Sequence, residues 1–180
     1  MVVGVCGSIA AYKVAVLVRL LIKQDADVYV AMTEAATRFI GPATLRALSR
    51  HPVITDMWAS DSPWDEPHVA LGERAHLYLI APATADMLGR LAAGLADDVV
   101  SATALATRAP ILLAPAMSDL MTVSPAVQEN LERLRVRGLH IIGPERGPLA
   151  SGKVGIGRMA EPEAIAAEVV AIVGGAKSRT

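Results

Sequence analysis

The stretch VVGVCGSIAAYK, residues 2–13, begins as an apolar run, passes through a Gly-Ser pair and continues as an amphipathic segment. The apolar run is continuous rather than alternating, which is typical of a strand that is buried on both faces of a parallel sheet. Ser8 stands where the amphipathic segment begins, and its hydroxyl could cap a helix there. The stretch therefore predicts a β-strand, a tight loop and an α-helix.

The same alternation of strand and helix continues along the rest of the chain. Further short apolar runs occupy residues 27–32, 77–81, 111–114 and 139–142. Helical patterns occupy residues 9–24, 41–50, 84–94, 97–107, 125–137 and 162–173. Strands that alternate with helices form βαβ units with right-handed crossovers, so the sequence predicts the α/β class and a parallel sheet.

Length and composition are those of one domain with a substantial core. The chain has 180 residues, of which 53% are hydrophobic, and we expect a single domain over 1–175, with a frayed tail or the start of a linker at 176–180. Cys6 is the only cysteine, which rules out a disulfide framework or a cysteine-based zinc site within one chain, and we expect no metal site. Because Cys6 lies in an apolar run, we expect its thiol to be buried and unreactive.

Charge and hydropathy argue against two classes of partner. The formal net charge is −1, with acidic and basic residues interspersed, which argues against a nucleic acid held mainly by charge. No apolar run approaches the ~18 residues that a membrane span requires. The first residues, MVVGVCGS, have neither a basic n-region nor a signal-like apolar segment, so we expect a cytoplasmic protein without a membrane partner.

Two strand ends repeat one pattern. YLIAPATAD (78–86) and LLAPAMSD (112–119) each join an aliphatic run to Ala-Pro-Ala and then to a hydroxyl residue close to an aspartate. The carboxyl ends of parallel strands share one edge of the sheet, where α/β proteins bind ligands. Ser8 and Thr33 follow two further strands, and a helix N-terminus at such a position suits a phosphate. The segments that follow these strands predict a flat, phosphorylated cofactor, although neither G-x-G-x-x-G nor a Walker A loop is present.

The same segments carry a resemblance to a known family, the homo-oligomeric flavin-containing cysteine decarboxylases. This family includes the phosphopantothenoylcysteine decarboxylases of coenzyme A synthesis and the enzymes that decarboxylate the C-terminal cysteine of ribosomal peptides. The similar segments are GVCGSIAAYK, VAMTEAATRFIGPATL, HVALGERAHLYLIAPATADMLGRLAAGLADDVVSATALAT, PAMSDLM and LASGKVGIGRMAEP. The resemblance implies a Rossmann-like, flavodoxin-type three-layer sandwich with bound FMN. It also implies a homotrimer, which could assemble further into a homododecamer, with each flavin at a subunit interface.

The resemblance also assigns roles to individual residues. It implies that FMN is contacted by Gly7, Ser8, Ile9, Thr33, Phe39, Ala83, Thr84, Ala85, Asp86 and Ala116. It implies that the substrate is contacted by Met117, Ser118, Met121, Ser151, Gly152, Lys153 and Arg158. His68 matches the family's essential histidine, and a histidine is a natural base for a thiol near neutral pH. The glycine-rich clamp SGKVGIGR, residues 151–158, is expected to be flexible and to close over the substrate.

Two departures from the family pattern bear on the reaction. The motif asparagine that holds the substrate carboxylate is Ser118 here, and the clamp cysteine that donates a proton in coenzyme A synthesis is Ser151. A serine hydroxyl is a far weaker acid than a thiol. We therefore expect FMN-dependent oxidative decarboxylation of a C-terminal peptidyl cysteine through a thioaldehyde to an aminoenethiol. Decarboxylation of phosphopantothenoylcysteine is the first alternative, and a catalytically inactive flavin-binding interaction subunit is the second.

Overall fold

A computed structural model describes the backbone of residues 1–177 and the side chains of residues 1–175. It contains a six-stranded sheet in the order β3-β2-β1-β4-β5-β6, and every pair of neighbouring strands is parallel. The strands are β1 (Val2–Val5), β2 (Tyr29–Met32), β3 (Val53–Ile54), β4 (Tyr78–Ala83), β5 (Ile111–Pro115) and β6 (His140–Ile141). The chain extends the sheet outward from β1 and then, in the other direction, from β4, so the strand order reverses between these two strands.

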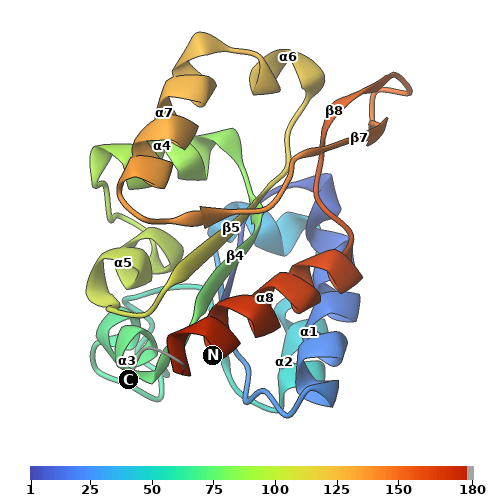
Figure 1. Cartoon of the computed structure of the whole chain (residues 1–180). Helices are drawn as coiled ribbons and strands as arrows, with labels where there is room; N and C mark the ends of the chain where they lie inside the picture. Colours follow the sequence, from blue (N-terminus) through green and yellow to red (C-terminus); the bar gives the residue numbers. More distant parts are fainter. Residues whose placement is uncertain (178–180) are drawn as a thin grey trace.

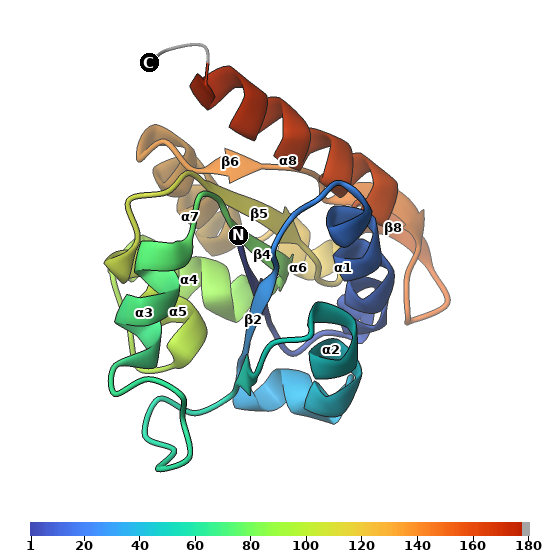
Figure 2. The ribbon, with the colours of Figure 1, turned by 90° about the horizontal axis from the view of Figure 1, so that it is seen from below.

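Helices cover both faces of the sheet (Figure 1). One face carries α1 (Val14–Lys23), α2 (Pro42–Ser49) and α8 (Pro162–Lys177). The other carries α3 (Pro67–Arg74), α4 (Ala85–Ala93), α5 (Val99–Ala106) and α7 (Pro125–Val136). Figure 2 shows these two groups on opposite sides of the strands, and each group packs on its own cluster of buried apolar side chains. The predicted α/β class, parallel sheet and three-layer sandwich are confirmed.

Short elements gather at the carboxyl edge of the sheet. The 3₁₀ helices η1 (Ile9–Lys13) and η2 (Glu34–Arg38) follow β1 and β2, and α6 (Asp119–Thr122) follows β5. An antiparallel hairpin of β7 (Glu145–Pro148) and β8 (Val154–Arg158) projects beside α6 (Figure 1). The sequence predicts no strands in this hairpin, because its glycine-rich residues lack an apolar alternation.

The C-terminal helix is longer than the sequence pattern predicts. Helix α8 continues to Lys177, so residues 176 and 177 are helical rather than part of a frayed tail. The rest of the expected tail, residues 178–180, lies outside the described residues. Within the described part of the chain, no helix has both the length and the apolar character needed to cross a membrane.

Candidate functional site

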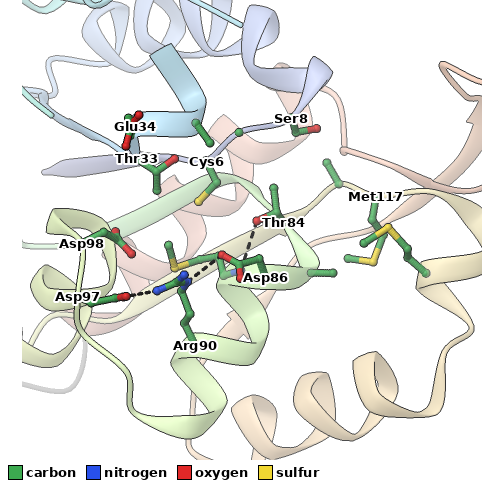
Figure 3. A pocket seen from close by; sticks show the side chains of 16 residues that line it. Cys6, Ser8, Thr33, Glu34, Thr84, Asp86, Arg90, Asp97, Asp98 and Met117 are labelled. Carbon is green, nitrogen blue, oxygen red and sulfur yellow. Dashed lines mark hydrogen bonds and ion pairs between the residues drawn. The ribbon is translucent and has the colours of Figure 1, made fainter. Parts of the chain in front are cut away.

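The first cavity lies where the strand order reverses, at the carboxyl ends of β1, β2, β4 and β5 (Figure 3). Its volume is about 630 Å³. Its lining residues are Cys6, Gly7, Ser8, Thr33, Glu34, Ala35, Thr84, Ala85, Asp86, Met87, Arg90, Asp97, Asp98, Ala116, Met117 and Met121. This is the edge at which open α/β sheets bind ligands and at which the strand exits of the sequence predict a cofactor.

Three hydroxyl residues that begin helices line this cavity. Ser8, Thr33 and Thr84 follow β1, β2 and β4, and each side-chain oxygen accepts a hydrogen bond of 3.2 to 3.3 Å from a backbone N–H two or three residues later. Because the oxygen accepts this bond, the hydroxyl proton remains to be donated to a ligand. The first N–H groups of a helix also lack partners within it. This donor set fits a phosphate group, and hence the phosphate end of FMN.

Carboxylates on another wall of the cavity are already paired. Arg90 donates from Nε to Oδ2 of Asp86 at 2.8 Å and from Nη1 to Asp97 (Figure 3). The hydrogen bond from Arg90 lowers the pKa of Asp97, and the two carboxylates raise the pKa of Arg90. Asp98 caps α5 by accepting two backbone N–H groups. Asp86 therefore pairs with α4's own arginine rather than presenting an uncompensated charge to a ligand.

Cys6 lines the first cavity but is 1% exposed. Burial raises the pKa of its thiol strongly, so the thiol stays protonated. The expectation of a buried thiol is confirmed. Cys6 lines the first cavity and Ser151 lines a different one.

A second cavity adjoins the first and has a volume of about 630 Å³. Ser8, Ala116 and Met117 line both cavities, so the end of β5 forms a wall common to the two. The hairpin of β7 and β8, residues 145–158, contains the clamp and is called the clamp hairpin from here on. The other lining residues come from η1, the start of α6, the clamp hairpin and the segment before α8: Ile9, Ala10, Tyr12, Lys13, Ser118, Pro148, Leu149, Ala150, Ser151, Gly157, Arg158, Met159 and Glu161. A molecule could therefore extend from the first cavity into the second.

An ionic cluster lines the second cavity. Lys13 Nζ lies 3.0 Å from Oε2 of Glu161, and Arg158 donates from Nη2 to the other oxygen of the same carboxylate. The side chain of Lys13 is only 12% exposed. Lys13, followed by Arg158, lowers the pKa of Glu161, which is therefore ionised. Oε2 of Glu145 lies 4.0 Å from Nη2 of Arg158, so the two cations face two carboxylates and the cluster carries no excess charge. The sequence interpretation missed Lys13 and Glu161, which lie 148 positions apart and meet only in the fold.

His68 lies in neither of these cavities. It lines a third, of about 500 Å³, together with residues of the loop before α3 and of α5. Its Nδ1 atom is buried and has no hydrogen-bond partner among the described residues. Within one chain, the structure therefore does not bring His68 to the cavity that holds the predicted cofactor residues.

The other predicted residues divide between the cavities and the surface. The first cavity is lined by most of the predicted cofactor residues: Gly7, Ser8, Thr33, Thr84, Ala85, Asp86 and Ala116. The second is lined by Ile9, Met117, Ser118, Ser151 and Arg158. Phe39 is exposed, and Phe39, Gly152 and Lys153 line none of the three cavities. Ala83 is buried within β4.

Ser118 is a fourth hydroxyl cap at the same edge of the sheet. It follows β5 and begins α6, and its Oγ accepts a hydrogen bond from the N–H of Met121 at 3.3 Å. The side chain of Met121 lines the first cavity, whereas Ser118 lines the second. Serine thus takes over the capping role that an asparagine could fill, and its own proton remains free to meet a carboxylate.

The parallel sheet has hydroxyl residues at the carboxyl ends of its strands, around a cavity at the point where the strand order reverses. Open α/β proteins bind phosphorylated ligands at such a position. The chain belongs to the Flavoprotein family, whose model matches residues 1–174. This membership confirms the family that the sequence motifs resemble.

Relatives within this family include proteins of two kinds. The chain is 48% identical over 170 residues to the "Coenzyme A biosynthesis bifunctional protein CoaBC" of Escherichia coli K12, covering 94% of this chain and 42% of that protein. The chain thus spans less than half the length of this relative. Among solved structures, it is similar to the FMN-dependent cysteine decarboxylase SpaF, with a TM-score of 0.80, 34% identity and 95% of each chain covered. It is also similar to a mutant PPC decarboxylase complexed with pantothenoylaminoethenethiol, with a TM-score of 0.83, 31% identity and coverage of 93% of this chain and 94% of that one.

Proposed function

We propose that the chain binds FMN and decarboxylates phosphopantothenoylcysteine. The observation that carries this proposal is the 48% identity to the coenzyme A protein over 94% of this chain, against 34% identity to SpaF. The comparisons therefore favour the first alternative of the sequence interpretation over the peptidyl-cysteine hypothesis. Because the chain spans 42% of that relative, the proposal concerns decarboxylation alone.

The first cavity would hold the cofactor. Ser8, Thr33 and Thr84 would donate hydrogen bonds to the phosphate of FMN, and the small side chains of Ala85 and Ala116 would let its ring system approach the backbone. When bound, FMN supplies an acceptor for the two electrons that leave the sulfur-bearing carbon of the substrate. The resulting thioaldehyde is an electron sink, which an ordinary cysteine lacks, so the carboxylate can depart as carbon dioxide. The protein's own tasks are to bind the substrate, orient it and remove the thiol proton.

His68 is the residue proposed to remove the thiol proton, and it would act on the cavity of a second copy. The third cavity, which His68 lines, is also lined by the exposed apolar side chains of Trp58 and Leu105. An exposed apolar side chain, that of Met121, also lines the first cavity, and the exposed Leu120 precedes it in the sequence. Apolar surface that is rimmed by polar groups is typical of interaction sites. An oligomer that joins these two surfaces would complete the site, which supports the expected homotrimer.

The second cavity would hold the rest of the substrate. Ser118 would donate to the carboxylate before it leaves, and Lys13 and Arg158 would donate charge-assisted hydrogen bonds to the phosphate. Ser151 is a weak acid for the later protonation of the substrate carbon. Tyr12 lines the same cavity, and its phenol is a stronger acid than the alcohol of Ser151. Tyr12 would therefore be the better donor of this proton.

Substrate preference tests this proposal. Release of carbon dioxide would be measured with phosphopantothenoylcysteine, with pantothenoylcysteine and with a peptide that ends in cysteine. We expect the highest kcat/KM with the phosphorylated substrate. A higher value for the peptide would favour the peptidyl-cysteine hypothesis, which the replacement of the clamp cysteine by Ser151 motivates. FMN binding without turnover of any of the three would favour an inactive interaction subunit.

A further inference from the structure

The clamp hairpin contacts the wall common to the two cavities through glycine residues. In β8, Gly155 and Gly157 are two residues apart, so they lie on the same side of the strand. Both face the segment 117–119, which leaves β5 and begins α6. Figure 1 shows β8 passing beside α6 at this point.

The contact at Gly157 is between backbone and backbone. The N–H of Met117 donates to the carbonyl oxygen of Gly157 at 2.9 Å. A Cβ added at Gly157 would lie 2.2 Å from the carbonyl oxygen of Met117, a backbone atom that cannot rotate away. A Cβ at Gly155 would lie 2.8 Å from Cβ of Asp119. The absence of a side chain at both positions is therefore required by close contact.

The expectation that all three clamp glycines serve flexibility needs a correction. Among them, only Gly152, which follows the turn at the hairpin tip, has a positive φ, of 80°. Gly155 and Gly157 adopt backbone conformations open to other residues and are held against segment 117–119. The base of the clamp is thus fixed, and any movement is confined to the tip.

This contact joins two segments that line the second cavity. Ser118 follows Met117 directly, and Arg158 follows Gly157 directly and joins Glu161 and Lys13 in the ionic cluster. We propose that Gly157 is a positioning residue that latches the clamp hairpin onto Met117, and so fixes the distance between Ser118 and the ionic cluster. The latch follows from the contact alone, whereas its effect on the substrate rests on the proposed function.

Trypsin cleavage after Lys153, which is exposed at the hairpin tip, measures the latch without any substrate. Gly157→Ala should displace the hairpin and speed this cleavage about tenfold, because overpacking opens the contact. The effect should be smaller for Gly155→Ala. Gly147→Ala is the matched control: its Cβ would meet only the flexible side chain of Arg158, at 3.2 Å, and cleavage should stay at the wild-type rate. Bound FMN should be retained in all three variants.

Kinetics with phosphopantothenoylcysteine then test the positioning role. Gly157→Ala should raise KM about tenfold with a smaller change in kcat, whereas a general loss of structure would lower flavin content and Tm. Unchanged trypsin cleavage in Gly157→Ala overturns the latch. Faster cleavage with an unchanged KM overturns its role in substrate positioning. If the wild type fails to turn over the substrate, the proposed function fails, and the trypsin series still decides the latch. If Gly157→Ala does not fold, Gly155→Ala against Gly147→Ala decides it.

Discussion

Replacing Lys13 by glutamine should remove most of the preference for a phosphorylated substrate. The ammonium group of Lys13 lines the second cavity on a side chain that is only 12% exposed, so solvent screens it little. A hydrogen bond to a charged group contributes about 1.5–3 kcal/mol. Glu161 competes with the ligand for this ammonium group, so the lower part of that range applies, and kcat/KM should fall roughly 10- to 30-fold. Glu161 keeps Arg158 as a partner, so the variant should fold.

The assay compares phosphopantothenoylcysteine with pantothenoylcysteine, which lacks the phosphate. The fall in kcat/KM should be confined to the phosphorylated substrate, and flavin content should not change. Lys23→Gln removes the same charge from an exposed residue of α1 that lies outside the three cavities, and it serves as the control. An equal fall with both substrates, or no fall at all, would refute the assignment of Lys13 to the phosphate.

Two further predictions concern the catalytic role of His68 and the dependence of Tm on pH in the acid range. His68→Asn should leave FMN bound and lower turnover by ~10²–10⁴-fold. Mixed oligomers of this variant with Thr84→Arg, which would block the first cavity, should regain activity in co-expression, and an inactive mixture would count against a site shared between copies. The hydrogen bond from His51 lowers the pKa of Asp27, so this pair stabilises the fold above the ordinary carboxyl pKa and the stabilisation is lost as pH falls through the lowered value. Asp27→Asn should therefore make Tm fall less steeply between about pH 5 and pH 2, and an unchanged profile would show that the pair contributes nothing.

Most of the fold could be predicted because its strands are buried on both faces. Continuous apolar runs such as that of β4 stand out in the sequence, and most of the helices lie within the helical ranges that the sequence predicts. Helix α3 lies outside those ranges and is missed. Strand β3 has only two residues, too few for a pattern. The β7–β8 hairpin is missed for a different reason. Gly155 and Gly157 are required by contact with segment 117–119, and a tertiary contact leaves no periodic signal.

The candidate site could be predicted where one segment carries both the strand and its cap. Thr33 and Thr84 directly follow β2 and β4, and Ser8 lies three residues after the end of β1, so motif and geometry coincide. The pairing of Lys13 with Glu161 could not be foreseen, because it depends on how α8 returns to the start of the sheet. The sequence context of His68 suggests a base but does not say which cavity the histidine lines.

The most direct test of the proposed function is the mass of the product. FMN-loaded protein would be incubated with phosphopantothenoylcysteine in the absence of oxygen, and the product would be analysed by mass spectrometry. We predict a product that is lighter than the substrate by one molecule of carbon dioxide alone, formed over many turnovers, because the electrons taken from the substrate return to it. A product that has also lost two hydrogens, formed only once per flavin, would contradict this account and favour the oxidative chemistry of the peptide enzymes.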